Sequence, residues 1–127
     1  THGDLLCTDD TRYLTLRRQL RDPAWQRDFL AKPLAERRKI AAELRQLSAT
    51  EIAAKSEDIM DVNQATVEQT MRDHDVRLLL HGHTHRPAVH DFALDGKPAQ
   101  RIVLSDWYAT ASLVRWTAAG FSLDRLP

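Results

Sequence analysis

The sequence predicts a mixed α/β protein of the α+β type, with helices in its first part and strands in its second. Three observations support this prediction. Charged amphipathic stretches with helix-capping residues fill residues 11–74, a largely apolar run follows at 76–80, and alternating apolar residues with turn signals occupy 88–126. The chain has 127 residues, which suits one domain with its own core.

Two short helices are expected first. Asp9 and Asp10 are candidate N-caps for a helix over residues 11–21, because short polar side chains satisfy the free N–H groups of a first turn. Asp22 followed by Pro23 predicts the start of a second helix over residues 23–32, since proline is tolerated in the first turn.

Two further helices are expected over residues 34–47 and 61–74. In the first of them apolar residues recur at helical spacing and basic residues take the other faces, which makes it amphipathic. Its apolar stripe needs a cover, for which the candidates are Trp25, Phe29 and Leu30. The pattern weakens over residues 48–56. In the last helix Asp61 and Gln64 resemble a capping box. The inner face of that helix is predicted to hold Met60, Val67 and Met71.

The second part of the chain is predicted to contain a buried strand and two hairpins. Residues 76–80 are apolar apart from Arg77, as in a strand that is covered on both faces. Residues 88–94 alternate, and the turn signal at 95–98 leads to a strand over 101–104. Strands over 112–116 and 121–126, with a turn at 118–120, make the second hairpin.

Charge is unevenly distributed along the chain. Lys plus Arg and Asp plus Glu both number 18, but residues 11–55 hold eleven of the basic residues and only five of the acidic ones. This asymmetry indicates either an anionic partner, such as a phosphorylated ligand or a membrane surface, or a solvated helical face. Cys7 is the only cysteine, so a disulfide framework and a thiolate metal cluster are excluded, and a small buried residue is expected.

Targeting signals are not evident. The chain has no apolar run near 18 residues and no signal peptide at its start, so a soluble or peripheral protein of a reducing compartment is expected. The first residues are Thr1 and His2, with no methionine, and we therefore expect a cut or processed chain.

Histidines provide the strongest functional signal. His81, His83 and His85 follow the apolar run at i, i+2 spacing, and neutral imidazoles on a loop can converge on metal ions. The spacing does not require all three to be ligands. Single histidines are more often packed or surface residues, and that interpretation suits His74 and His90.

Two short motifs resemble those of the calcineurin-like metallophosphoesterases: Gly82-His83-Thr84-His85 and Thr1-His2-Gly3-Asp4. Three longer segments, residues 2–10, 59–64 and 81–90, together resemble the UDP-2,3-diacylglucosamine hydrolase (diphosphatase) family of lipid A biosynthesis, within that superfamily. The resemblance extends over the whole chain and concerns the C-terminal part of the family only.

The resemblance implies a fold and a domain organisation. It implies a single partial domain, residues 1–127, which is the C-terminal half of a metallophosphoesterase β-sandwich flanked by helices. Residues 11–74 would be a helical lid insertion with a connecting helix, and residues 75–127 the strand-rich half of the core.

The resemblance also implies a metal-dependent hydrolase. In that family two metal ions, usually manganese, activate a hydroxide that attacks the UDP-sugar diphosphate, giving 2,3-diacylglucosamine 1-phosphate (lipid X) and UMP. His2 and His83 would bind one metal and His85 the other. The hydroxide is the nucleophile, so no catalytic side chain is assigned, and His81 is expected to be a supporting or structural residue.

Substrate and membrane contacts are implied as well. The substrate-binding residues would be Asp10, Ser48, Lys55 and His83, while Ile52 stands where the family can offer an asparagine. The basic helices would cover the acyl chains and face anionic head groups, on the cytoplasmic face of the inner membrane of a Gram-negative bacterium, as a peripheral protein. No nucleic-acid partner is expected.

Several family motifs do not occur in this chain. Such enzymes also use an Asp-x-His motif, a Gly-Asp motif with a metal-bridging aspartate and a Gly-Asn motif, and none of these precedes or follows His2 here. We therefore expect the chain to be inactive alone and to need the N-terminal half of the same enzyme as its partner. Two alternatives remain: a non-catalytic module that binds anionic lipid, or another calcineurin-like phosphoesterase that acts on a nucleotide or a phosphoprotein.

Overall fold

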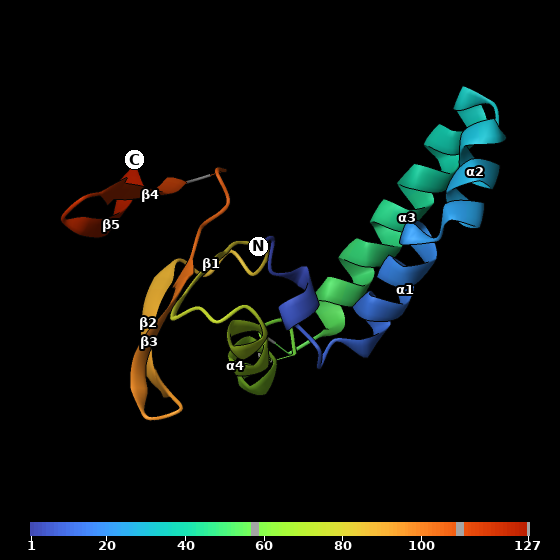
Figure 1. Ribbon diagram of the computed structural model, residues 1–127. Coiled ribbons are helices and arrows are strands. Elements are labelled where there is room, and N and C mark those ends of the chain that lie inside the picture. Colours follow the sequence, from blue (N-terminus) through green and yellow to red (C-terminus); the bar gives the residue numbers. More distant parts are fainter. Residues whose placement is uncertain (57–58, 109–110, 127) are drawn as a thin grey trace. The chain divides into compact units, whose positions relative to one another are not determined.

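The computed structural model describes residues 1–56, 59–108 and 111–126 (Figure 1). These residues form two compact units: a strand unit, Thr1–Thr8 with Asp61–Pro127, and a helical unit, Asp9–Met60. The strand unit contains the short 3-10 helix η1 (Asp4–Leu6), α4 (Gln64–Asp73), β1 (Leu78–His81), β2 (Ala88–Leu94), β3 (Lys97–Val103), β4 (Ala111–Thr117) and β5 (Gly120–Leu126). The helical unit contains α1 (Thr11–Arg21), α2 (Pro23–Ala31) and α3 (Leu34–Ala54). The predicted mixed α/β class is confirmed.

The strand unit is built on a three-stranded sheet in the order β1-β3-β2. The central strand β3 runs parallel to β1 and antiparallel to β2, with Leu79 opposite Arg101. The β2–β3 hairpin is confirmed: Asp95 and Gly96 both have positive φ, 51° and 72°, as a two-residue hairpin turn requires. The first strand is shorter than predicted, because it begins at Leu78 and ends at His81.

The core of the strand unit lies between α4 and the sheet. Val67 and Met71 are fully buried, as their spacing on one helix face predicts. They pack in one cluster with Leu6, Leu79, Leu94 and Ala99. Cys7 is buried too, as expected for the single cysteine.

The start of α4 corrects one prediction. The N-cap is Asn63, whose Oδ1 accepts from the Thr66 N–H at 3.1 Å. Asp61 instead accepts from the Val62 N–H and does not cap α4, so the predicted capping box with Gln64 is wrong. Met60 precedes the helix and belongs to the helical unit, and it is therefore not part of the inner face of α4.

The second predicted hairpin is confirmed as β4–β5. Its strands pair from Ala111 with Leu126 to Thr117 with Gly120, and Gly120 turns with φ +124°. The rings of Trp116 and Phe121 stack across the pair with centroids 5.8 Å apart. Among the described residues this hairpin is a sheet of its own.

The first two helices of the helical unit begin at the residues that the sequence predicts. Asp10 accepts from the Tyr13 N–H at 3.0 Å, and Asp22 accepts from the Trp25 N–H at 2.8 Å. The third helix runs seven residues further than expected, to Ala54, because good helix formers continue it where the apolar spacing fades. Thus residues 48–54, over which the pattern weakens, are helical.

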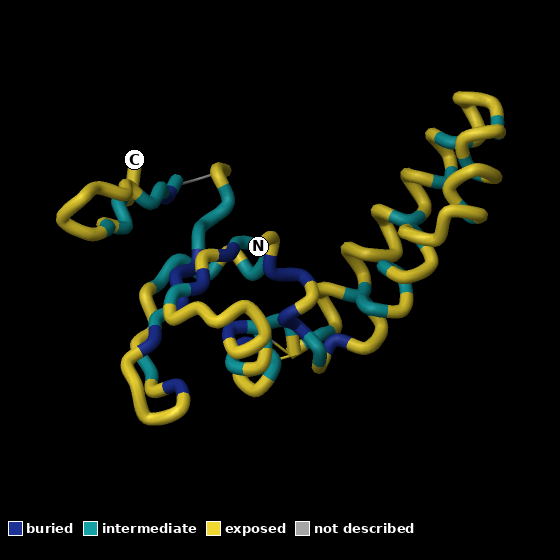
Figure 2. The backbone as a smooth tube through the Cα atoms, viewed as in Figure 1, coloured by how far each residue is buried: buried dark blue, intermediate teal, exposed yellow. Residues whose placement is uncertain are grey.

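Apolar side chains are not buried in the three helices of the helical unit, as Figure 2 shows in teal and yellow. Trp25 and Phe29 stack with ring centroids 5.1 Å apart. Leu30 is 63% exposed, so only a small part of its side chain is available to cover the apolar stripe of α3. Among the described residues no helix is both long and apolar enough to span a bilayer. The grouping of residues 11–74 as a lid with a connecting helix stays a prediction.

Candidate functional site

The histidine loop leaves the end of β1 in an unusual backbone conformation. His81 is the last strand residue, and its carbonyl accepts from the Leu104 N–H at 2.9 Å. His83 and His85 both adopt positive φ, 67° and 55°. Residues other than glycine rarely occupy this region, and they do so at sites where surrounding contacts hold them. The loop is therefore a constrained segment whose backbone fixes the orientation of the His83 and His85 side chains.

The first residues of the chain lie beside this loop. The Gly82 N–H donates to the His2 carbonyl at 3.0 Å, and the Thr1 nitrogen donates to the Leu80 carbonyl at 3.0 Å. These bonds bring His2 against His83, with ring centroids 4.9 Å apart and planes tilted by 58°. Two imidazoles at this separation are suited to bind one transition-metal ion.

Gly3 is required by this close approach. Its φ is +111°, and a Cβ placed there would lie 2.8 Å from His81 Nδ1 and 3.0 Å from the Gly82 carbonyl oxygen. A side chain would therefore push the His2 segment away from the loop.

Two carboxylates orient the outer histidines. His2 Nδ1 donates to Asp4 Oδ1 at 2.9 Å, and the Asp4 side chain is only 9% exposed whereas that of His2 is 67% exposed. His85 Nδ1 lies 3.3 Å from Asp106 Oδ2. A carboxylate on one ring nitrogen fixes the tautomer and leaves the other nitrogen free for a metal ion. The described residues contain no group of three or more His, Cys, Asp or Glu side chains placed to hold an ion.

His81 is directed inward, unlike its neighbours. It is 1% exposed, and its Nδ1 donates to the Gly82 carbonyl at 2.8 Å while its Nε2 accepts from Arg101 Nη1 at 3.1 Å. Burial lowers the pKa of His81 by more than the bond to Gly82 raises it, and the charge of Arg101 lowers it further. The ring is neutral at pH 7.

Arg101 is a buried cation on the central strand. Burial lowers the pKa of its guanidinium, and the negative charge of Asp61 opposes that shift. Asp61 also pairs with Arg86, Oδ2 to Nη1 at 3.1 Å, next to the histidine loop. His90 lies opposite Arg101 on β2, and burial together with the charge of Arg101 lowers its pKa.

Three of the predicted substrate residues belong to the helical unit. Asp10 and Lys55 form an ion pair, and Ser48 lies on one face of α3. Lys55 Nζ lies 2.9 and 2.8 Å from the two oxygens of Asp10, and both side chains are nearly buried. Ser48 is exposed on α3, seven residues before Lys55 and so on the same face. Ile52 lies between them on that face and is 54% exposed. His83 belongs to the strand unit.

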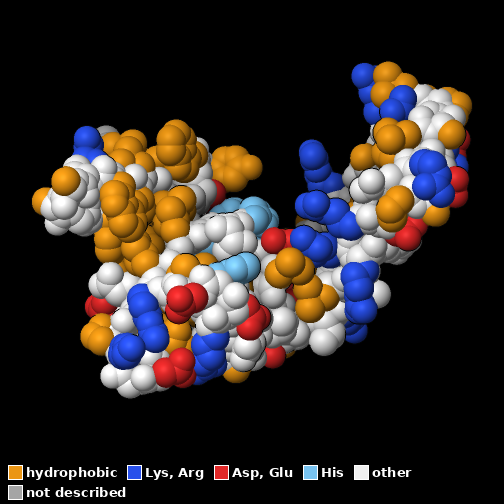
Figure 3. Space-filling model, in the orientation of Figure 1, with side chains coloured by type: hydrophobic (Ala, Val, Ile, Leu, Met, Phe, Trp, Pro, Cys, Tyr) orange, Lys and Arg blue, Asp and Glu red, His pale blue; other side chains and the backbone are white. Residues whose placement is uncertain are grey.

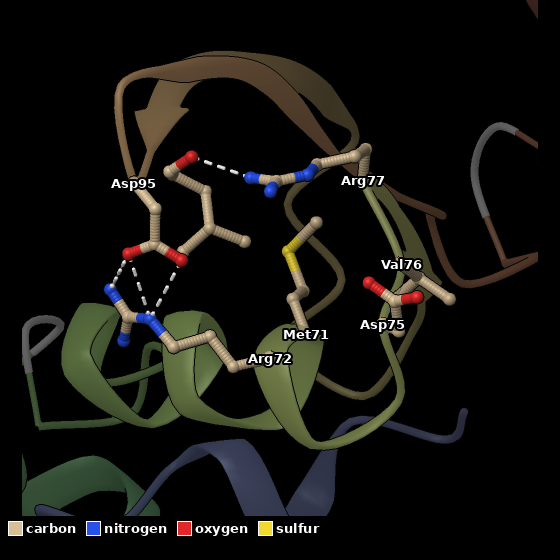
Figure 4. A pocket seen from close by; sticks show the side chains of 7 residues that line it. Met71, Arg72, Asp75, Val76, Arg77 and Asp95 are labelled. Atoms are coloured by element: carbon tan, nitrogen blue, oxygen red, sulfur yellow. Dashed lines mark hydrogen bonds and ion pairs between the residues drawn. The ribbon is translucent and has the colours of Figure 1, made fainter.

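A cavity of about 280 Å³ opens elsewhere in the strand unit, at the end of α4 (Figure 4). Two of its charged side chains pair: Arg72 lies 2.9 Å from Asp95, and that pair lowers the pKa of Asp95. The cavity is lined by Met71, Arg72, Asp75, Val76, Arg77, Leu94 and Asp95. No residue predicted for the site is among them.

The sequence did not identify three residues that support the histidines: Asp4, Asp106 and Arg101. Asp4 could have been found, because it follows His2 by two residues within a motif. Asp106 and Arg101 carry no local signal, since they lie 21 and 20 residues from the histidines that they contact.

No family model matches this chain, but comparison with known proteins identifies relatives. The chain is 50% identical over 120 residues to a protein of Aromatoleum aromaticum, 55% identical over 106 residues to one of Chromohalobacter salexigens, and 48% identical over 126 residues to one of Salmonella typhi. These matches cover 94%, 84% and 99% of this chain but 49%, 43% and 52% of the relatives. Each relative is named UDP-2,3-diacylglucosamine hydrolase. The chain thus spans about half the length of the curated relatives it matches.

Proposed function

Because this chain is a homologue of the UDP-2,3-diacylglucosamine hydrolases, we propose that it forms part of an enzyme that hydrolyses the diphosphate of UDP-2,3-diacylglucosamine. The products are 2,3-diacylglucosamine 1-phosphate and UMP. The observation that carries this proposal is the pairing of His2 with His83, whose rings lie 4.9 Å apart on segments distant in the sequence.

The imidazoles of this chain fit a divalent metal site by their chemistry and their support. His2 and His83 would hold one ion and His85 a second, with Asp4 and Asp106 orienting the outer rings. Two manganese ions would supply water activation and neutralisation of phosphate charge. His83, beside the bound ion, would also contact the phosphate of the substrate.

Three imidazoles are too few ligands for two ions, and carboxylates are the usual further ligands of manganese. We propose that the other ligands come from the part of the relatives' length that this chain does not span. The strand unit would then be half of a metallophosphoesterase sandwich. On this proposal the 127 residues alone bind metal weakly and release no UMP.

The helical unit would hold the sugar phosphate and its acyl chains. Lys55 can donate to a phosphate oxygen while Asp10 holds its ammonium in place, and the Ser48 hydroxyl can donate from the same face of α3. Ile52 would offer an apolar contact at that face.

A membrane role for the helical unit is proposed on its surface chemistry. Leu30, Leu34 and Leu47 are more than half exposed, and Lys and Arg side chains lie among such apolar ones on this unit (Figure 3). Apolar side chains interleaved with basic ones suit the surface of an anionic bilayer. The enzyme would act as a lid-bearing peripheral protein on the cytoplasmic face of the inner membrane.

The decisive experiment is a chimaera in which this chain replaces the region that it matches in the Salmonella typhi relative. We expect the chimaera to release UMP from UDP-2,3-diacylglucosamine with manganese, and His83→Ala to lower kcat by about 100-fold or more. His74→Ala is the matched control, because His74 is an exposed histidine at the end of α4, and it should leave kcat unchanged.

Three results would contradict the proposal. Equal activity of His83→Ala and the unchanged chimaera would remove His83 from the metal site. If the chimaera cleaves simple nucleotide or phosphoprotein esters but not UDP-2,3-diacylglucosamine, the proposed substrate is wrong. Binding of this chain to anionic liposomes, undiminished in the His83→Ala, His85→Ala variant and accompanied by an inactive chimaera, would favour the lipid-binding module instead.

A further inference from the structure

Arg101 places a positive charge at the centre of the sheet, where burying an apolar residue would cost less free energy. It lies on the middle strand β3, is 7% exposed, and has the fully buried Ile102 and Val103 as its next neighbours. An arginine is almost never buried to this degree without a partner that needs it. The strand therefore keeps this cation for a contact that an apolar side chain could not make.

That contact is made with a single histidine ring, and it determines where the proton of the ring lies. Arg101 Nη1 lies 3.1 Å from His81 Nε2, and His81 Nδ1 lies 2.8 Å from the Gly82 carbonyl oxygen. A guanidinium only donates and a carbonyl only accepts, so Nε2 must carry the lone pair and Nδ1 the hydrogen. Arg101 thus selects one tautomer of His81 and, through it, a donor to the loop.

The loop beyond His81 needs such a support. The Gly82 carbonyl accepts from His81 Nδ1 and also from the Thr84 N–H at 2.8 Å, which closes a tight turn around His83. His83 and His85 stay in the left-handed region only while contacts of this kind hold them. The chain of bonds from Arg101 therefore ends at the backbone that orients the metal-ligating rings.

The same ring also supports the other segment of the site. Gly3 lies so close to His81 that a Cβ on it would be 2.8 Å from Nδ1, and Gly82 donates to the His2 carbonyl. A rotated His81 ring would therefore displace the segment of His2 as well as the loop of His83.

We propose that Arg101 is a positioning residue of the metal site, which acts through the His81 ring and the Gly82 carbonyl to hold His83 beside His2. This inference rests on the proposed function in one respect, that His2 and His83 bind the ion. Arg101 itself touches neither metal nor substrate in this arrangement.

The tautomer provides a test that does not depend on metal. In nitrogen-15 spectra of the 127-residue chain, and of the chimaera, His81 should show a protonated Nδ1 and an unprotonated Nε2. In Arg101→Met the two nitrogen signals of His81 should move towards each other, because nothing then keeps the proton on Nδ1 alone. A protonated Nε2 on His81 in the unchanged protein would overturn the proposal.

Metal affinity of the chimaera provides the second test, by titration with manganese. Arg101→Met removes every donor and should weaken binding about 10-fold, while Arg101→Lys, which keeps one donor for His81 Nε2, should stay within about threefold of the unchanged chimaera. The matched control is Arg77→Met, because Arg77 is also an arginine of the strand unit but donates to the Leu94 carbonyl, away from the loop. This control should leave manganese binding unchanged.

A double-mutant cycle shows whether Arg101 acts through His81. His81→Asn keeps a donor for the Gly82 carbonyl but offers Arg101 no ring nitrogen, so it should lower affinity about as much as Arg101→Met. The double variant should lose about 10-fold in manganese affinity and not about 100-fold, because both substitutions remove the same interaction between Arg101 and His81. Multiplying losses, or an Arg101→Lys variant as weak as Arg101→Met, would contradict the inference.

Failure of this inference is distinguishable from failure of the proposed function. Unchanged binding in Arg101→Met together with lost binding in His83→Ala would reject the role of Arg101 and retain the metal site. Unchanged binding in both variants would reject the metal site itself. Where His81→Asn does not fold, the comparison of Arg101→Met with Arg101→Lys decides the question.

Discussion

The strand unit and the helical unit place their apolar side chains in opposite environments. In the strand unit Val67 and Met71 are completely buried between α4 and the sheet, whereas in the described helices of the helical unit no side chain is buried. The one buried residue of the described helical unit is Asp10. The first unit is therefore stabilised by a core, and the second by caps, ion pairs and helix propensity.

This difference explains where a precise site can form. Side chains of a precise site need support from packed neighbours, and the histidine loop receives it from β1, β3 and the buried pair of His81 with Arg101. The helical unit offers exposed leucines and long basic side chains, which can adapt to a flexible ligand or surface. On the proposed function, the metal site and the surface for the lipid thus belong to different units.

The strongest test of the comparison is truncation in the core of the strand unit. Met71→Ala should lower the free energy of unfolding by about 3 kcal/mol, because a fully buried side chain leaves a cavity. Leu47→Ala, on the 53% exposed Leu47 of α3, should change it by less than about 0.5 kcal/mol. Urea unfolding followed by circular dichroism measures both. Similar losses in the two variants would mean that the helical unit has a core after all.

An intermediate effect is expected at Asp10, where the helical unit concentrates its polar stabilisation. Asp10→Ala should cost about 2 kcal/mol, because it removes the N-cap of α1 and leaves the nearly buried Lys55 ammonium without its carboxylate. Asp10→Asn keeps the cap and should cost about half as much. Thermal unfolding of the helical signal measures the loss.

The control for Asp10 is the other aspartate cap of the helical unit. Asp22 caps α2 from an exposed position, so Asp22→Ala should cost about 1 kcal/mol from the cap alone. If Asp10→Ala costs no more than Asp22→Ala, then the pair with Lys55 does not stabilise the unit.

The smallest effect concerns an exposed ion pair of the strand unit. The hydrogen bond from Arg72 holds the pKa of Asp95 below its ordinary value of 3.8. Because the folded pKa is the lower one, the stabilisation is fully present above that ordinary value and is lost as the pH falls through the folded pKa. Asp95→Asn should therefore lower Tm slightly at pH 7 and not at all at the lowest pH.

The measurement is Tm of both proteins across the acid range. Asp73→Asn, on the same helix, is the control, because the Asp73 carboxylate accepts from the Gln69 amide. A Tm difference between the unchanged protein and Asp95→Asn that persists or grows towards acid pH would show that the pair with Arg72 is not its source.

Local signals in the sequence were sufficient for most element boundaries. Asp10 and Asp22 start α1 and α2 because their side chains bond to N–H groups three residues ahead, and Asp95-Gly96 turns the first hairpin because both residues tolerate positive φ. The errors arose where several residues compete for one role. Asn63, not Asp61, caps α4, and α3 extends beyond the point at which its apolar spacing fades.

The sequence by itself determined which residues can do chemistry here: the histidines, their motifs and the resemblance that they carry. The neighbours of those histidines were decided only by tertiary structure, since His2 reaches His83 through pairing of the first residues with the loop after β1. Arg101 and Asp106 likewise meet His81 and His85 because β3 runs parallel beside β1. The physical reason is range: caps and turns depend on atoms a few residues apart, whereas a metal site depends on strand register that only the packed sheet establishes.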